Sequence, residues 1–289
     1  MTRTRIQDWI NQSTERVPFR QAVHTILVAI TRSDTLKTNM IMKGGILLAL
    51  GYESTRYTKD IDFSTAKTLK EFELETFIQE LQSALVDAVE SLDYGLDCRV
   101  QSYKQKPPKS DATFPTIEIS VGYAYKHDRN AHRRLLHKNS SNIVEIDYSL
   151  NEPSREVEVF EIAEGQQIQI YSFTELVAEK YRAILQQVVR NRRRRQDVYD
   201  LNFLLSHYPQ ARDAATRAKI LDSLVEKSNS RGLTVSKDSL SDSEVIKLSK
   251  EEYHLLTSEI GERLPDFDQL YSVIKDYYES LPWYVSATS

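Results

Sequence analysis

The chain has 289 residues, of which 40% are hydrophobic and 28% are charged. These values are typical of a globular protein, and the length allows one large domain or two modest ones. The formal net charge is −4, so binding of nucleic acid would have to come from local basic patches. The single cysteine, Cys98, excludes an intrachain disulfide and a cysteine-based metal cluster, and we expect it to be a packing residue.

The first residues and the apolar runs of the chain indicate its location in the cell. Residues 1–8 lack the apolar core of a signal peptide. No stretch approaches the roughly 18 apolar residues that a transmembrane helix needs. We therefore expect a cytoplasmic protein with no membrane partner.

The first part of the chain combines helical patterns with one short strand. Apolar residues at helical spacing predict amphipathic helices near 5–12 and 19–32, and a long helix over 69–92. Between them we expect a short lead-in segment at 39–42, a helix over 44–50 and a strand over 60–63. The strand is indicated by Ile61 and Phe63, which alternate with Asp60 and Asp62.

The middle of the chain is rich in strands. Strand-like runs cover 97–103, 116–125, 142–150, 156–161 and 167–171. The segment 104–110 holds two prolines and three lysines, which predicts a loop. A basic segment, 126–138, contains His127, His132 and His137 and is expected to be a loop as well. Nucleic-acid contact or simple solvent exposure suits this segment better than metal binding, because the histidine spacing fits no helix face.

The last part of the chain is predicted to be helical. Ser172-Phe173-Thr174-Glu175 has the pattern of a capping box, in which the serine and glutamate satisfy each other's backbone N–H groups. Helices are expected to follow to the end, apart from a polar loop over 228–242, and the last helix covers 267–281. A strand-rich part followed by a helical part predicts an α+β protein with domains at 1–171 and 172–289.

Two short motifs carry most of the chemical information. Gly44-Gly45 opens a helix, where glycines let backbone N–H groups approach a phosphate. Asp60 and Asp62 lie on one face of a strand, and adjacent carboxylates usually share a divalent cation. A turn and an exposed strand edge are the plainer interpretations of each motif alone. Their combination favours chemistry on a nucleoside triphosphate.

The motifs resemble those of a known family. Met42-Lys43-Gly44-Gly45, the run 56–63 (RYTKDIDF), Glu179-Lys180 and the run 197–201 (DVYDL) are similar to the AbiEii/AbiGii-type toxins, which include MenT-like nucleotidyltransferases. The resemblance extends from about Lys43 to Leu205. It implies a nucleotidyltransferase-like mixed sheet with flanking helices, followed by a helical domain that completes the active-site cleft. Many relatives have Ser or Thr where this chain has Ile46.

The resemblance also implies roles for individual residues. Asp60 and Asp62 would bind Mg²⁺ or Mn²⁺, and a third carboxylate would come from a neighbouring strand. Both Glu145 and Asp147 qualify, and the family's strand pattern favours Asp147. Backbone and cationic groups near the strand would bind the nucleotide, namely Lys43, Gly44, Gly45, Arg56 and Lys59.

Two further groups lie in the helical part. The resemblance makes Lys180 a cation for the triphosphate and Asp197 a functional carboxylate, with Asp200 structural. A solvated lysine and arginine–aspartate pairs that hold helices together are the plain alternatives. Five arginines could bind triphosphate or RNA phosphates, or form a solvated face: Arg190, Arg192, Arg193, Arg194 and Arg195.

The leading hypothesis is therefore a Mg-dependent nucleotidyltransferase toxin of a toxin–antitoxin or abortive-infection system. By resemblance to MenT-like members, it would transfer a nucleotide from an NTP to an RNA acceptor, with tRNA as the expected acceptor, and a cognate antitoxin would be its partner. One alternative acceptor is a protein or a small molecule. An inactive regulator that only binds nucleotide or RNA is a second alternative, which the presence of both Asp60 and Asp62 disfavours.

Overall fold

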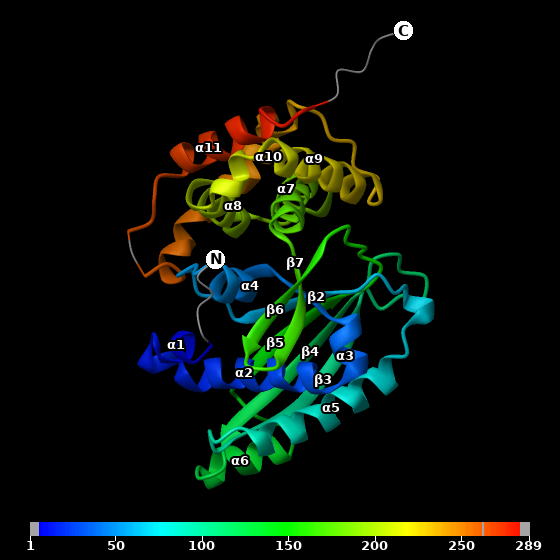
Figure 1. The fold of residues 1–289 in the computed structure, drawn as a ribbon, viewed down its shortest axis with the longest axis vertical. Helices are drawn as coiled ribbons and strands as arrows, with labels where there is room; N and C mark the ends of the chain where they lie inside the picture. Colours follow the sequence, from blue (N-terminus) through cyan, green and yellow to red (C-terminus); the bar gives the residue numbers. More distant parts are fainter. Residues whose placement is uncertain (1–5, 262, 284–289) are drawn as a thin grey trace. The chain divides into compact units, whose positions relative to one another are not determined.

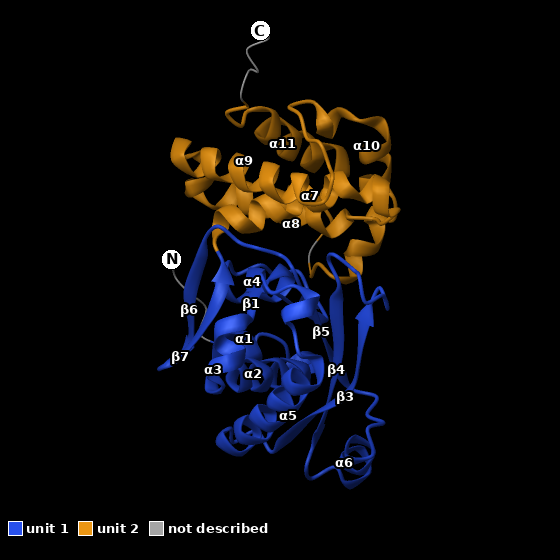
Figure 2. Cartoon of the chain, turned by 90° about the vertical axis from the view of Figure 1, so that its right-hand side faces the viewer, with its two compact units in different colours: residues 1–171 blue, residues 172–289 orange. Residues whose placement is uncertain are grey.

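The computed structural model describes residues 6–261 and 263–283. The chain forms two compact units, Met1–Tyr171 and Ser172–Ser289 (Figure 2). The first unit contains a sheet with helices, and the described residues of the second form helices and no strand, which confirms the prediction of an α+β protein.

A mixed seven-stranded sheet forms the centre of the first unit (Figure 1). The strand order is β3-β4-β5-β2-β1-β7-β6. The pairs β2–β5 and β1–β7 are parallel, and the other neighbours are antiparallel. The strands are β1 Ile41–Lys43, β2 Asp60–Ser64, β3 Leu96–Lys106, β4 Thr116–Tyr125, β5 Ile143–Ser149, β6 Val157–Ala163 and β7 Gln166–Tyr171.

Two long helices, α2 and α5, pack against each other and cover one face of this sheet (Figure 1). Their inward stripes, such as Ile26 and Ile30 on α2 and Leu81 and Leu85 on α5, are completely buried. Each such side chain contributes about 1.5–3 kcal/mol on burial. The helices of this unit are α1 Ile6–Asn11, α2 Val17–Arg32, α3 Asp34–Asn39, α4 Gly44–Gly51, α5 Leu74–Ser91 and α6 Arg129–Leu136.

The structure corrects several predicted elements of the first unit. Strand β3 continues to Lys106, because Lys104 and Lys106 both pair with Glu118 of the neighbouring β4. The predicted helix 69–92 is divided into a short 3-10 turn, Leu69–Glu71, and α5, because Thr68 and Glu71 form a capping box before α5 begins.

Three more elements of the first unit differ from the predictions. The lead-in segment contains strand β1, and helix α3 precedes it. The basic segment 126–138 contains helix α6, which begins at Arg129 after its N-cap Asp128, whose carboxylate accepts from two backbone N–H groups. Its single buried residue, Leu135, provides too weak an apolar pattern for prediction.

The second unit is built around α7, which packs on α8, α9 and α10. Its core contains large apolar side chains such as Tyr181, Ile184 and Leu224, none of which is exposed. The main helices are α7 Phe173–Arg190, α8 Arg195–His207, α9 Ala214–Asn229, α10 Ser243–Lys250 and α11 Phe267–Glu279. Helix α9 extends to Asn229, so the polar connection begins after it and includes a 3-10 turn at Ser239–Ser241.

The start of α7 shows one half of the predicted capping box. Ser172 Oγ accepts from the backbone N–H of Glu175 at 3.3 Å. The Glu175 carboxylate is buried and binds α9, accepting from Ser223 Oγ at 2.8 Å and pairing with Lys227 at 2.8 Å. This glutamate therefore ties two helices of the second unit together.

None of the described helices combines the length and the apolar character needed to cross a bilayer.

Candidate active site

Charged residues form a row across the polar face of the sheet in the first unit. On β2, Ile61 and Phe63 are completely buried, so Asp62 between them lies on the opposite face. The strand register places Asp62 beside Lys43 of β1 and beside Asp147 of β5. Asp147 in turn lies beside Glu118 of β4. Neighbouring strands are about 4.8 Å apart, so three carboxylates occupy adjacent positions.

A second row runs parallel to the first. Asp60 is in register with Glu145 of β5, and Glu145 is in register with Ser120 of β4. The Ser120 hydroxyl lies 2.9 and 2.8 Å from the two oxygens of the Glu145 carboxylate. Glu145 thus has a hydroxyl donor on its neighbouring strand, whereas Asp147 is the strand neighbour of Asp62.

The electrostatics of the rows reflect crowding of like charges. Burial raises the pKa of Asp147, and the nearby carboxylates of Asp60, Glu118 and Glu145 raise it further. Glu118 is different. Although burial opposes its ionisation, hydrogen bonds from Lys106 and Lys104 lower its pKa. Negative charge is therefore held at unfavourable energy around Asp147, which is where a cation would be stabilising.

The glycine pair lies directly against this row. Gly44 has a φ of +72°, and a Cβ there would lie 1.9 Å from Asp62 Oδ2. A Cβ at Gly45 would lie 2.9 Å from the side chain of Thr58. No larger residue fits at Gly44 without displacing the carboxylate, so the start of α4 and Asp62 are in direct contact.

The cations predicted to bind nucleotide have different environments. Lys43 is buried, forms an ion pair with Glu152 and donates to Ser149 Oγ at 3.4 Å. Arg56 is buried and donates to the carbonyl of Tyr57 at 3.4 Å, while Lys59 is exposed.

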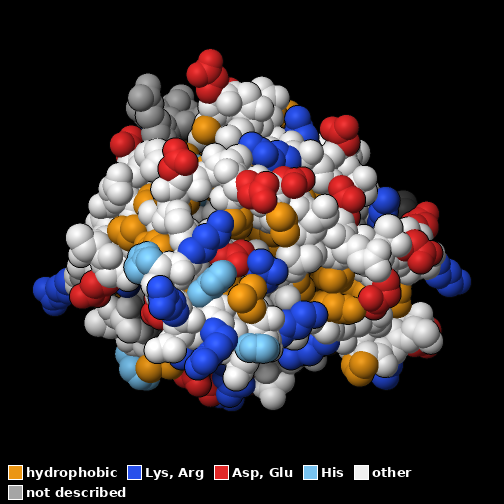
Figure 3. Space-filling view, turned by 90° about the horizontal axis from the view of Figure 1, so that it is seen from below, with side chains coloured by type: hydrophobic (Ala, Val, Ile, Leu, Met, Phe, Trp, Pro, Cys, Tyr) orange, Lys and Arg blue, Asp and Glu red, His pale blue; other side chains and the backbone are white. Residues whose placement is uncertain are grey.

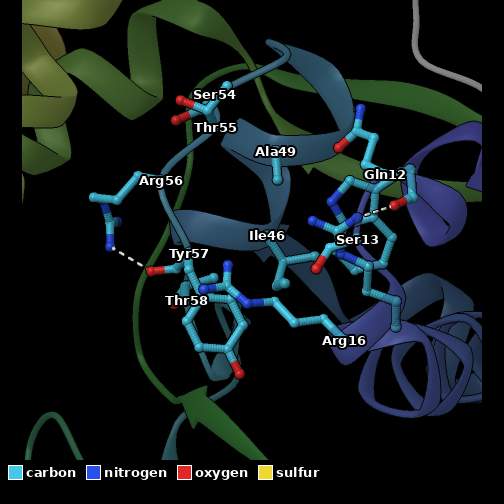
Figure 4. Close-up of a pocket in the computed structure, with 12 residues that line it drawn as sticks. Gln12, Ser13, Arg16, Ile46, Ala49, Ser54, Thr55, Arg56, Tyr57 and Thr58 are labelled. Atoms are coloured by element: carbon cyan, nitrogen blue, oxygen red, sulfur yellow. Dashed lines mark hydrogen bonds between the residues drawn. The ribbon is translucent and has the colours of Figure 1, made fainter. Parts of the chain in front are cut away.

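A pocket of about 320 Å³ lies beside α4 in the first unit (Figure 4). It is bounded by the 54–58 segment, by Ile46 and Ala49 of α4, and by residues from α1 to the start of α2. Arg16 and Arg20 lie in it. These two arginines were not predicted as site residues, because nothing in the sequence brings residues 16 and 20 together with residues 54–58.

Lys180 is at the centre of an ion cluster in the second unit. Its Nζ lies 3.0 Å from Asp197 Oδ1 and 2.7 Å from Asp200 Oδ2, and Lys180 is buried. The solvated lysine considered as an alternative is therefore wrong. Lysine–aspartate pairs join α7 to α8, and Arg194 lies 3.7 Å from Asp197 as well.

The arginine run is partly neutralised within its own unit. Arg193 pairs with Glu251 at 2.7 Å, and Arg195 lies 3.2 Å from Glu252. Arg190 and Arg192 are exposed, and no ion pair to either is found among the described residues. Desolvation and the surrounding arginines lower the pKa of Arg190 to about 10.

A basic surface surrounds α6 in the first unit. Lys, Arg and His side chains gather on the face seen in Figure 3. On this helix Arg133 and Arg134 are exposed, whereas His132 Nε2 lies 2.8 Å from Asp97 Oδ2. The histidine is thus a structural link to β3. Cys98, next to Asp97, is completely buried, as predicted for a packing residue.

The carboxylate oxygens of Asp60 and Asp62 are suitable ligands for Mg²⁺, the ion predicted from the sequence. Over the described part of the chain, no three His, Cys, Asp or Glu residues converge into a ready-made cage. Mg²⁺ seldom uses such a cage, because it usually takes one or two carboxylates together with substrate phosphates and water. Asp60 and Asp62 supply hard oxygen donors, and the crowded carboxylates beside them supply negative charge.

A mixed sheet with adjacent carboxylates next to a glycine-opened helix belongs to the nucleotidyltransferase class of folds. The family model described as "Nucleotidyl transferase AbiEii toxin, Type IV TA system" matches residues 25–273. The chain therefore belongs to the AbiEii nucleotidyltransferase toxin family of type IV toxin–antitoxin systems, which confirms the resemblance that its motifs indicated.

The chain was also compared with solved structures and with curated proteins. The chain is similar to a crystal structure of a presumed nucleotidyltransferase from H. pylori, with 14% identity and a TM-score of 0.49. The match covers 92% of this chain and 94% of that chain. No curated protein matches the chain. These results carry no conclusion about substrate.

Proposed function

We propose that this protein is an active, Mg-dependent nucleotidyltransferase that transfers a nucleotide from an NTP to RNA, with tRNA as the expected acceptor. The observation that supports this most strongly is the contact between Gly44 and Asp62, which joins a phosphate-binding type of helix start to a carboxylate row. A cytoplasmic site of action and a cognate antitoxin partner belong to the same proposal.

The glycine pair and the cations would bind the triphosphate. Backbone N–H groups at the start of α4 favour negative charge, since the helix N-terminus carries a partial positive charge. Lys43, Arg56 and Lys59 lie next to this helix start or lead into β2. Their charges would offset part of the triphosphate charge and orient it for reaction.

The carboxylates would organise the reacting groups. Asp60 and Asp62 would hold Mg²⁺, which stabilises the charge on attacking and leaving oxygens when bound. Asp147 lies beside Asp62 and has a raised pKa, so it is suited to accept the proton of the acceptor hydroxyl. The hydroxyl oxygen then forms a bond to the α-phosphorus, and the bond to the bridging oxygen breaks to release pyrophosphate.

Residues of the second unit would assist. Lys180, held by Asp197 and Asp200, would provide a positioned cation for the triphosphate. Arg190 and Arg192 would provide the free charge for RNA phosphates, whereas Arg193, Arg194 and Arg195 also have acidic neighbours.

The test is a labelling experiment with the full chain. Each α-labelled NTP is incubated with Mg²⁺ and the protein, and with either total RNA or total protein as acceptor. We expect label in RNA, enriched in tRNA, and none after addition of EDTA. Label in protein alone would replace RNA with a protein acceptor. Absence of label in both fractions would contradict the proposed transfer.

The matched variants for this assay are Asp62→Asn and Asp87→Asn. Both remove one carboxylate charge from the first unit, but Asp87 is exposed on α5. We expect transfer to be lost only in the first variant. Equal activity of the two variants would remove Asp62 from the site.

A further inference from the structure

The pocket beside α4 contains an unusual concentration of positive charge. We call it the arginine pocket and define it by Arg16, Arg20, Trp9 and Tyr57, which all line it together with Arg56, the residue assigned above to the triphosphate. Its volume of about 320 Å³ lies at the lower end of the range found for small-ligand sites. The loop that carries Arg56 and Tyr57 continues directly into β2 and its carboxylates.

Aromatic rings hold two of the arginines in place. The Arg16 guanidinium lies over the Tyr57 ring, 3.8 Å from its centroid, as Figure 4 shows. The Arg20 guanidinium lies 4.9 Å from the Trp9 ring centroid, and Arg20 also donates to the Trp9 carbonyl. Guanidinium groups held in this way lose little further conformational entropy when they bind an anion.

The positive charge of Arg16 and Arg20 has no ion-pair partner within the described part of the chain. Burial lowers the pKa of Arg20, and the neighbouring Arg16 lowers it further. The two side chains repel each other one helical turn apart, so an anion bound between them would be stabilising.

We propose that the arginine pocket binds a backbone phosphate of the RNA acceptor, close to the nucleotide whose hydroxyl reacts. This inference rests on the proposed function. Only two residues separate Tyr57 from Asp60, so the pocket and the carboxylates are within roughly 10 Å along the chain. Thr58, between them, packs against Gly45. A nucleic-acid strand could therefore occupy both places at once.

Two observations favour the acceptor over the NTP as the ligand. The pocket borders the side of α4 at Ile46 and Ala49, whereas the triphosphate is assigned to the helix start at Gly44. Arg16 and Arg20 also precede residues 25–273, which match the family model. The chemistry shared by the family is carried by the matched region, so residues outside it are better placed to select an acceptor.

The test compares Arg16→Gln with Arg32→Gln in the full chain. Both residues lie at or near the ends of α2, and Arg32 is exposed at the other end, away from the arginine pocket. Binding of bulk tRNA, of a short single-stranded RNA and of NTP with Mg²⁺ is measured separately over a range of salt concentrations. Arg16→Lys retains the charge, and thermal unfolding shows that each variant is folded.

We expect Arg16→Gln to weaken binding of both RNA probes roughly tenfold, as expected for loss of one charged hydrogen bond. The slope of log K against log salt should fall by about 0.7 for the single strand. Arg32→Gln should leave RNA binding unchanged, Arg16→Lys should restore most of it, and NTP affinity should stay the same in all variants.

Other results would overturn the inference. A loss of NTP affinity with unchanged RNA binding would make the arginine pocket a nucleotide site. Unchanged binding of every probe would leave the arginines with a structural role only. The proposed function is tested separately, because RNA binding that depends on Arg16 without any transfer of label would refute the transfer and leave the phosphate site standing.

Discussion

The two units each contain a charge cluster that bears on function, and the two clusters are built in opposite ways. In the first unit, Asp62, Asp147 and Glu118 occupy adjacent strand positions, so like charges are neighbours. In the second unit, Lys180 lies between Asp197 and Asp200, so opposite charges are neighbours. Crowding raises the pKa of Asp147, so a bound cation would stabilise the first arrangement, whereas in the second Lys180 already has two acidic partners. Crowding of like charge is therefore the better sign of a ligand site.

The sharpest test of this contrast is removal of the carboxylates. Asp60→Ala and Asp62→Ala should each reduce nucleotide transfer by at least about 10²–10³-fold, because ion binding supplies several kcal/mol to the transition state. Neither change should unfold the protein, since it relieves repulsion at the edge of the core. Transfer assays and circular dichroism check both points. Full activity in either variant, with Mg²⁺ still required, would eliminate the proposed metal site.

A second test compares two buried lysines of the helical unit. Lys180 pairs with Asp197 and Asp200, and Lys227 pairs with Glu175 at 2.8 Å. Substitution of either lysine by Met removes the cation that a buried carboxylate, Asp200 or Glu175, pairs with, so each should cost up to about 3–5 kcal/mol of unfolding free energy.

Only Lys180→Met should also raise the KM for NTP or abolish transfer. Denaturant titration measures stability, and steady-state kinetics at a temperature where both variants are folded measures activity. Equal kinetic effects of the two substitutions would show that Lys180 is a structural residue like Lys227.

A third test uses the raised pKa of Asp147. A carboxyl group whose pKa is higher in the folded state contributes stability below its unfolded pKa and loses it as the pH rises. Asp147→Asn should therefore raise the Tm modestly at neutral pH, and this gain should disappear at acid pH. The same variant should lose transfer activity. A lower Tm at neutral pH would contradict the crowding described for this carboxylate.

The smallest expected effect concerns the arginine run. Arg192→Ala should weaken tRNA binding slightly and reduce the salt slope by about 0.7–0.9, because one phosphate contact is lost. Arg193→Ala should change the slope less, since Arg193 already pairs with Glu251. Salt titrations of the two variants provide the comparison. If both variants and the unmodified chain have identical salt slopes, Arg192 does not contact RNA and is part of a solvated face.

Local sequence patterns predicted the secondary-structure elements around the site well. They did not predict how these elements pair to form it. The alternation at Asp60–Phe63 correctly indicated a strand, and the glycine pair correctly indicated the start of a helix. The register of β2 against β5 depends on pairing between distant segments, so the sequence left both Glu145 and Asp147 open. The structure places Asp147 beside Asp62, although the choice of catalytic carboxylate remains a prediction.

Other features were missed for physical reasons. Helix α3 and strand β1 contain six and three residues, which is too short for a periodic pattern. Burial of Lys180 could not be predicted, because lysines on helices are usually solvated and its partners lie on another helix. The arginine pocket combines segments from three parts of the first unit, which no local motif indicates.

The parallel pairing of β2 with β5 also determines when the proposed carboxylate site can assemble. Between Ser64 and Ile143 the chain forms α5, β3, β4 and α6 before it returns to β2. Pairing across such a long separation is slow, because the chain loses entropy before the contact is rewarded. A ribosome-bound fragment that ends before β5 has Asp60 and Asp62 but lacks Asp147. If Asp147 has the role proposed here, the chain would have no complete active site throughout the synthesis of its first 142 residues.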